Sequence, residues 1–285
     1  MGSIETLASI PVLGSGIGYR HELKEHIYEH KHAIDFVEII ADQFTGKAGA
    51  WAELAEVCSV FPVIPHGIGL SVGSATPLDG AYLRSIKAVS DFTEAPYYSD
   101  HLCMTRAPGI DIGHLSPLWL TEEVLATTIR NVQEVQESLG KPLVLENITY
   151  LFDVPAATMT EPEFFSRLVE ATGCGVLLDV TNVHINSVNH HFEPIRFLRE
   201  MPLQNVVQVH LAGGFWSDGI LVDGHSERVD ESSWGLFSAL AQMAQIKGCI
   251  VEQDANFPED LSGLLEDVTR AREVLARARP SGMQA

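Results

Sequence analysis

Short apolar runs that end in histidine, aspartate or glutamate recur six times along this chain of 285 residues. The clearest run is Val176-Leu177-Leu178, which leads directly into Asp179 and is followed within five residues by Thr181, Asn182 and His184. The other five runs deliver His66, His101 (after Asp100), Glu146, His210 and Glu252. Buried parallel strands read as continuous apolar runs. The repetition therefore predicts a parallel sheet that carries reactive side chains where its strands end.

Segments with helical patterns separate these runs and complete eight strand–helix units. The predicted strands cover residues 11–19, 36–40, 61–65, 96–99, 143–145, 176–179, 205–209 and 249–251. The predicted helices cover 20–32, 46–60, 78–93, 121–139, 160–172, 192–200, 231–245 and 258–279. Eight such units in about 250 residues are typical of a TIM barrel. We therefore predict one α/β domain, a (β/α)8 TIM barrel over residues 1–279, and a disordered tail at 280–285.

Charge and composition exclude several classes of function. The net charge of −20 argues against nucleic acid as a ligand. No run of about 18 apolar residues or signal-peptide pattern is found, so we predict a cytoplasmic protein that does not enter a membrane. The cysteines (Cys58, Cys103, Cys174 and Cys249) lack CxxC spacing, which favours buried reduced thiols over disulfides or thiolate metal ligands.

All strand ends of a closed parallel barrel meet on one face, where active sites form. The six strand-end residues should therefore converge, and Asp223 and His225 can join them from the loop after the seventh strand, on one face of an extended segment. Imidazoles and carboxylates together are the ligand set of zinc, iron or manganese. A catalytic ion usually takes about three or four protein ligands, so eight ligands predict two or three ions.

The residues beside these ligands have less defined roles. An extended chain after Asp179 would point Asn182 and His184 away from the site, whereas a turn would return Asn182 to it. Asn147 and Asp100 are predicted to orient ligands. Residues 103–117 and 211–230 are long loops, which are often binding surfaces.

Five motifs carry a resemblance to a known family. They are IPHGIGLSVGS at 64–74, SDHL at 99–102, LEN at 145–147, LLDVTNV at 177–183 and VHLAG at 209–213. These motifs resemble those of the MbnB/TglH-like multinuclear non-haem iron oxidases, and the similarity extends over residues 14–275. The resemblance implies two or three irons, mixed Fe(II)/Fe(III), with O2 as co-substrate. It also implies a ligand set of His66, His101, Glu146, Asp179, Asn182, His210, Asp223, His225 and Glu252. Position 182 is histidine in methanobactin-type members.

The resemblance further implies an enzyme that oxidatively modifies a cysteine of a ribosomally made peptide, with a small partner protein that presents the peptide. The stretch LGSGIGY at 13–19 and Asn182 favour the TglH-like branch, which excises the β-carbon of a C-terminal cysteine on a carrier peptide. The alternative within the family is oxazolone and thioamide formation. We assign no separate catalytic base beside the metal ligands.

Other functions fit parts of the pattern. A divalent-metal sugar isomerase or epimerase would use fewer ligands and a lysine or second carboxylate as proton shuttle, and no strand ends in lysine. A trinuclear-zinc endonuclease should carry a basic rim. A peptide-binding or metal-storage barrel would need coordinatively saturated metals.

Overall fold

The computed structural model describes residues 7–46 and 49–278, and its centre is a closed barrel of eight parallel strands. These strands are β1 (Gly14–Gly18), β2 (Val37–Ile40), β3 (Val63–Gly67), β4 (Tyr98–His101), β7 (Leu143–Glu146), β8 (Gly175–Asp179), β9 (Val206–Leu211) and β12 (Gly248–Val251). Their order around the barrel is β1-β12-β9-β8-β7-β4-β3-β2. The predicted single-domain TIM barrel is confirmed. The tail predicted at 280–285 lies outside the described residues.

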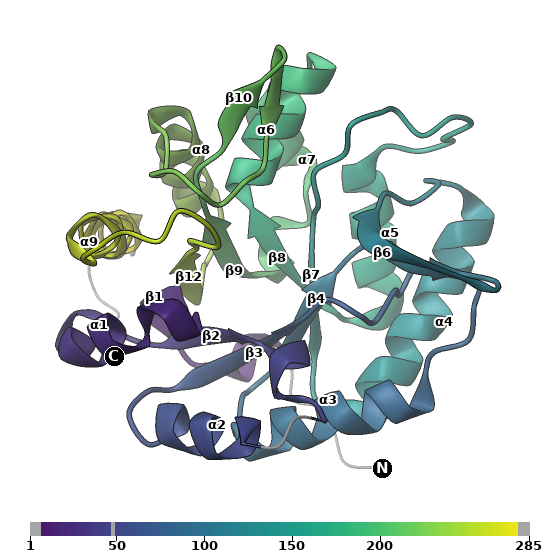
Figure 1. Cartoon of the computed structure of the whole chain (residues 1–285). Coiled ribbons are helices and arrows are strands. Elements are labelled where there is room, and N and C mark those ends of the chain that lie inside the picture. The colour runs from purple at the N-terminus through teal and green to yellow at the C-terminus, as the bar shows by residue number, and fades with distance from the viewer. Residues whose placement is uncertain (1–6, 47–48, 279–285) are drawn as a thin grey trace.

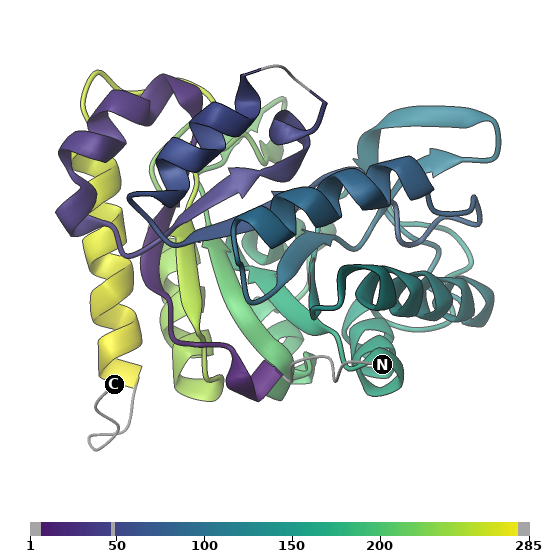
Figure 2. The ribbon, with the colours of Figure 1, turned by 90° about the horizontal axis from the view of Figure 1, so that it is seen from below.

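Helices surround the strands on all sides in Figure 1. They are α1 (Lys24–Glu29), α2 (Ala50–Cys58), α3 (Gly80–Phe92), α4 (Glu122–Leu139), α5 (Glu161–Thr172), α6 (Val180–His190), α7 (Pro194–Glu200), α8 (Glu231–Met243) and α9 (Ser262–Ala278). In Figure 2, α9 (yellow) stands beside the purple segment that contains α1, and it packs against β1. The pairing of β1 with β12 closes the barrel. Every helix in the described ranges is too short or too polar to span a lipid bilayer.

Capping residues set several helix ends. The Thr160 side chain accepts a hydrogen bond from the Glu163 amide at the start of α5, and Gly173 ends that helix with φ 68°. Thr121 and Gly140 do the same for α4. A threonine oxygen satisfies an unpaired amide at a helix start, and glycine tolerates the left-handed conformation that ends a helix.

Three segments differ from the sequence predictions. Residues 180–190 form α6 directly after β8, because the Asp179 side chain caps the new helix by accepting a hydrogen bond from the Asn182 amide. Residues 103–117 contain an antiparallel hairpin of β5 (Met104–Ala107) and β6 (Ile110–Ser116). Residues 211–230 contain a second hairpin of β10 (Phe215–Ser217) and β11 (Ile220–Val222). Asp218 and Gly219 both have positive φ at its tip, as a two-residue hairpin turn requires.

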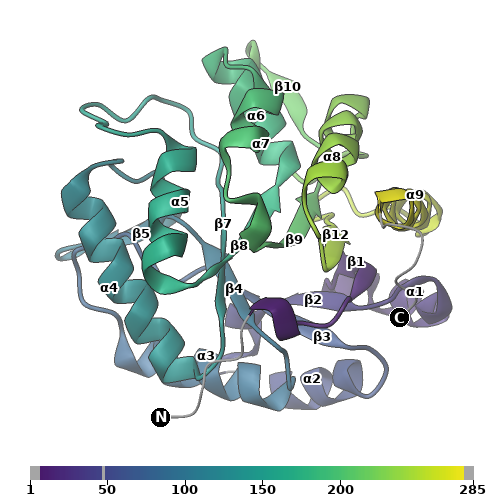
Figure 3. The same cartoon turned by 180° about the vertical axis from the view of Figure 1, so that it is seen from behind.

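An apolar floor closes one end of the barrel. The buried residues of this floor are Ile10, Phe36, Ile64, Ala95, Tyr97, Val144, Leu177, Val207 and Ile250. Figure 3 shows the N-terminal segment crossing the strands on this side. A larger apolar layer fills the space between strands and helices. Polar side chains inside the barrel are therefore shielded from water below and open to it only at the C-terminal strand ends.

Candidate metal centre

The predicted ligands meet at the C-terminal mouth of the barrel. A cavity of about 660 Å³ opens there, and it is lined by His66, His101, Glu146, Asn182, Asp223, His225 and Glu252. Asp179 and His210 are fully buried beside it. The strands thus bring together side chains that lie more than 180 residues apart in the sequence.

The first group is formed by His66, His101 and Glu146, from β3, β4 and β7. The Nε2 atoms of the two histidines lie 3.2 Å (His66) and 3.4 Å (His101) from the same carboxylate oxygen, Oε2 of Glu146. The two Nε2 atoms lie 3.4 Å from each other. The outer nitrogens are held by the protein: His66 Nδ1 is 2.9 Å from the Ser99 hydroxyl, and His101 Nδ1 is 3.1 Å from the Gly67 carbonyl. Because that carbonyl can only accept, His101 Nδ1 carries a proton and Nε2 is available as a ligand atom.

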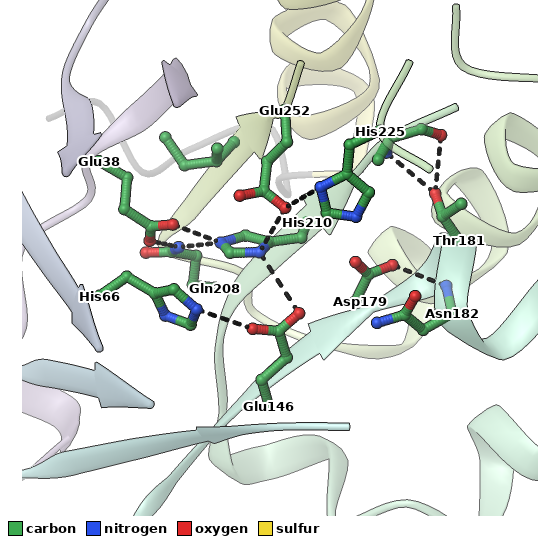
Figure 4. Close-up of polar contacts among 12 residues, drawn as sticks. Glu38, His66, Glu146, Asp179, Thr181, Asn182, Gln208, His210, His225 and Glu252 are labelled. Atoms are coloured by element: carbon green, nitrogen blue, oxygen red, sulfur yellow. Dashed lines mark hydrogen bonds and ion pairs between the residues drawn. The ribbon is translucent and has the colours of Figure 1, made fainter. Parts of the chain in front are cut away.

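The second group centres on His210 of β9, which Figure 4 shows between several carboxylates. Its Nδ1 lies 3.1 Å from Glu252 Oε2 and 3.5 Å from Glu146 Oε1. One ligand atom each of Glu146, Asp179 and His210 lies within 4.8 Å of the others. Glu146 therefore borders both this group and the first one.

The third group is built around His225, which follows β11. Its Nε2 lies 2.8 Å from Asp223 Oδ1, and its Nδ1 lies 3.1 Å from Asp254 Oδ2. The spacing of Asp223 and His225 suggested an extended segment. Instead, His225 has φ 45°, and this bend in the backbone brings the two side chains together. Asp179, His225 and Glu252 also offer ligand atoms within 4.8 Å of one another.

Unsatisfied polar atoms indicate that the site fits metal ions. Buried atoms of the described residues that form no well-aligned hydrogen bond include Glu146 Oε2, Asp179 Oδ2, Asn182 Oδ1, His210 Nδ1, Asp223 Oδ1 and His225 Nε2, although four of them lie 2.8–3.2 Å from another ligand atom. Leaving such an atom unpaired costs about 1–3 kcal/mol, and more for a charged group. All six belong to predicted ligands and are of the imidazole, carboxylate and carbonyl types that bind divalent cations. Cations between them would satisfy the whole set.

In the metal-free site, burial and neighbouring charged groups shift the pKa values of the ligands. Burial raises the pKa of Asp179 well above its usual range, and the neighbouring Glu146 and Asp223 raise it further. Burial lowers the pKa of His101 to about 4. For His66, burial acts to lower the pKa, but Glu38 and Glu146 outweigh it and raise the value to about 9. Bound cations would reverse the shift at Asp179 by favouring its charged form.

The residues next to the ligands have separate roles. The first turn of α6 returns Asn182 to the mouth, where its Nδ2 donates to the Asn147 carbonyl. His184 is not part of the cluster, because its Nε2 lies 3.7 Å from Asp230 at the start of α8. Asn147 makes two hydrogen bonds to the backbone of Asp179, as expected of a residue that orients a ligand.

Asp100 also acts on the backbone. It accepts hydrogen bonds from the amides of His101 and Leu70, so it fixes the chain that carries His101. Burial raises its pKa to about 7.

Four residues of the site were missed by the sequence analysis: Glu38, Gln208, Arg20 and Asp254. Glu38 and Gln208 are buried within β2 and β9, and the Arg20 guanidinium donates to Asp254 at 2.5 Å and lies 3.5 Å from Glu252. A charged or amide side chain inside an apolar strand is costly unless paired, and this was the available signal for Glu38 and Gln208. Arg20 and Asp254 carry no comparable signal, since each simply follows a strand by one to three residues.

The cysteines take no part in the ligand groups found among the described residues. All four are free thiols, and Cys103, Cys174 and Cys249 are buried. Burial raises the pKa of Cys174 to about 11 and that of Cys103 well above its usual range. These thiols are therefore structural, as the sequence predicts.

The chain is similar in sequence to known proteins. A family model described as "RiPP precursor modification enzyme MbnB/TglH/ChrH" matches residues 14–276. A UPF0276 protein of Acaryochloris marina is 31% identical over 274 residues, covering 96% of this chain and 99% of the relative. A UPF0276 protein of Caulobacter vibrioides is 34% identical over 271 residues, covering 94% and 96%.

Solved structures share the barrel. The D-psicose 3-epimerase of Clostridium cellulolyticum H10 aligns with a TM-score of 0.56 at 12% identity, over 95% of this chain and 97% of the other. A xylose isomerase domain protein of Alicyclobacillus acidocaldarius aligns with a TM-score of 0.55 at 17% identity, over 93% and 96%. At such identities the likeness concerns the fold alone.

Proposed function

The chain belongs to the MbnB/TglH/ChrH family of RiPP precursor modification enzymes, and from this premise we propose that it oxidatively modifies a cysteine of a ribosomally made peptide with two or three irons and O2. The observation that carries the proposal is the convergence in one mouth of six buried ligand atoms that form no well-aligned hydrogen bond. A site of this kind offers more ligands than one catalytic ion uses. Its mixture of imidazoles and carboxylates suits iron.

The proposed ligands are those inferred from the sequence: His66, His101, Glu146, Asp179, Asn182, His210, Asp223, His225 and Glu252. Glu146 would be shared by the first and second groups, and Asp179 by the second and third. Bound iron would supply electrons to O2 and an open position for the peptide thiolate. The protein would contribute the fixed donors and the dry floor of the barrel, which excludes water from below.

The peptide would enter by the open mouth. Beside the metal cavity lies an apolar groove of about 710 Å³, whose walls include Leu118, Tyr150, Phe192 and Phe197. Ile148 lines both spaces. We propose that residues next to the modified cysteine occupy this groove. The hairpins β5–β6 and β10–β11 are the proposed contacts of the partner protein that presents the peptide.

Within the family we propose the TglH-like reaction, excision of the β-carbon of a C-terminal cysteine. The test is anaerobic loading with Fe(II), addition of O2, and mass spectrometry of a cysteine-terminated carrier peptide in the presence of the partner. Loss of one methylene group with consumption of O2 would support this reaction. Loss of hydrogens with every carbon retained would support oxazolone and thioamide formation instead. Binding of one zinc or manganese ion, with no iron after anaerobic loading, would refute both.

A further inference from the structure

A buried chain of three polar side chains lies beneath the metal cluster, and it ends on His210. We infer that Glu38, held in place by Gln208 and Tyr97, is a positioning residue that fixes the tautomer of His210 and directs Nδ1 of that imidazole to the metal. This inference rests on the metal-binding function proposed above. It assigns a role to three residues outside the predicted ligand set, of which Glu38 also offers an oxygen within 4.8 Å of ligand atoms of His210 and Glu252.

The contacts of Glu38 leave it little freedom. Its side chain is 3% exposed, and its Oε1 lies 3.0 Å from His210 Nε2. Gln208 Nε2 donates to the other oxygen, Oε2, at 2.5 Å, and the same nitrogen lies 2.8 Å from His210 Nε2. The Tyr97 hydroxyl in turn donates to Gln208 Oε1. Figure 4 shows Glu38 and Gln208 on one side of the His210 ring and Glu146 and Glu252 on the other.

These contacts decide which nitrogen of His210 can bind a metal. Two groups face His210 Nε2: the Glu38 carboxylate, which only accepts hydrogen bonds, and the Gln208 amide nitrogen, which only donates them. The carboxylate prevails, because a hydrogen bond to a charged acceptor is roughly twice as strong as one between neutral groups, and the proton of the neutral imidazole is then on Nε2. The lone pair is then on Nδ1, the atom that faces Glu146 and Glu252 and has no hydrogen-bond partner among the described residues. The other neutral tautomer would turn an N–H toward the cluster and offer it no lone pair.

His210 differs from His66 and His101 in this respect. These two present Nε2 to the cluster, and their Nδ1 atoms contact the Ser99 hydroxyl and the Gly67 carbonyl. His225 faces ligands with both nitrogens, because its Nε2 lies 2.8 Å from Asp223 and its Nδ1 lies 3.6 Å from Glu252. His210 presents Nδ1, so it needs the opposite tautomer. A fully buried carboxylate behind Nε2 supplies this selection, because Gln208 occupies its second oxygen and prevents it from turning away.

The direct test is nitrogen-15 NMR of the histidine side chains in protein loaded with Zn(II), a diamagnetic probe. In the wild type we expect His210 to retain a proton on Nε2 and to bind through Nδ1, while His66 and His101 retain the proton on Nδ1. The Glu38→Gln variant should lose the protected Nε2 proton of His210 alone. Binding of His210 through Nε2, or an unchanged His210 signal in the variant, would overturn the inference.

Anaerobic titration of the metal-free protein with Fe(II) gives a second readout. Removing a carboxylate behind a histidine ligand typically weakens metal binding by about 10- to 100-fold. We expect that loss at one site of the Glu38→Gln variant, with the remaining sites unchanged. Asp267→Asn is the matched control, because Asp267 is also a buried carboxylate but pairs with Arg228 away from the mouth. An equal loss in both variants would show a general effect of buried charge and refute the assigned role.

If Glu38→Gln does not fold, Tyr97→Phe tests the same chain of contacts from its far end. This variant removes one hydroxyl and should weaken a single metal site by a few-fold; unchanged binding would show that Tyr97 does not support Glu38. A wild type that binds no metal would instead refute the proposed function itself, so the two failures are distinguishable.

Discussion

Replacing Glu146 by glutamine is the sharpest test of a shared metal centre. Glu146 contacts His66, His101 and His210 within 3.5 Å and belongs to two of the groups that offer converging ligand atoms. Glutamine keeps the shape of the side chain but replaces a charged oxygen with an N–H donor, which repels a cation. The variant should therefore lose the two metal positions that include residue 146 and keep the one at Asp179, His225 and Glu252.

The expected size of the effect follows from mass action. An ion present at a hundred times its Kd stabilises the folded state by about 2.7 kcal/mol. The entropy of unfolding for 285 residues is about 0.6 kcal/mol/K, so each ion should raise Tm by about 4–5 °C. With three ions the wild type should gain about 13 °C, and Glu146→Gln about 4–5 °C.

The assay is calorimetry without oxygen, with and without Fe(II), together with metal analysis of the same samples. Comparing each variant with its own metal-free form removes the effect of the substitution on the apoprotein. Glu122→Gln is the control, because Glu122 is an exposed carboxylate that pairs with Arg167, and it should retain the full gain. A Glu146→Gln protein with the wild-type gain in Tm and the wild-type iron content would refute a shared carboxylate.

Further predictions concern pH, a helix cap and two exposed aromatics. Metal affinity should rise from pH 6 to 9 by up to tenfold per pH unit for each proton that the metal displaces. The reason is that the metal-free protein holds protons on His66, whose pKa is about 9, and on Asp179. An affinity independent of pH would contradict this. The raised pKa of His66 also stabilises the metal-free fold below about pH 6.5, and that contribution should be lost as the pH rises through about 9, which denaturant titrations can measure. Thr160→Ala removes the cap of α5 and should cost about 1 kcal/mol, or about 2 °C in Tm, without changing O2 uptake. Trp119 and Trp216 are 46% and 63% exposed, so alanine at either position should leave Tm within about 1 °C of the wild-type value. Each substitution should weaken peptide binding several-fold, and an unchanged affinity would exclude that side chain from the peptide site.

Much of the fold could be predicted because the information is local. Each strand is a short apolar run, and each helix has a cap or an apolar stripe nearby in the sequence. The barrel then follows from the count of units, and the barrel places His66, Glu146 and His210 on one rim although they are far apart in the chain. The geometry of parallel strand ends explains why so simple a pattern located the cluster.

The remaining features depend on contacts that the sequence does not display. The helix α6 was missed because Asp179 was interpreted as a strand end only, whereas its side chain also starts a helix. The role of Glu38 depends on Gln208 and Tyr97, which are 170 and 59 positions away from it in the chain. No local pattern reveals such a pairing. The turn pair Asp218-Gly219 was an available signal for the second hairpin.

Asp179 is both the residue that starts helix α6 and a proposed metal ligand, and the first role affects the second. Its Oδ1 is engaged by the Asn182 amide at the start of α6, and only Oδ2 is left unpaired. Asp179 would therefore offer Oδ2 to a metal more readily than Oδ1, which favours binding through one oxygen. Monodentate carboxylates occupy fewer coordination positions than chelating ones, so the start of a helix helps to keep room at the metal for a molecule that arrives from outside.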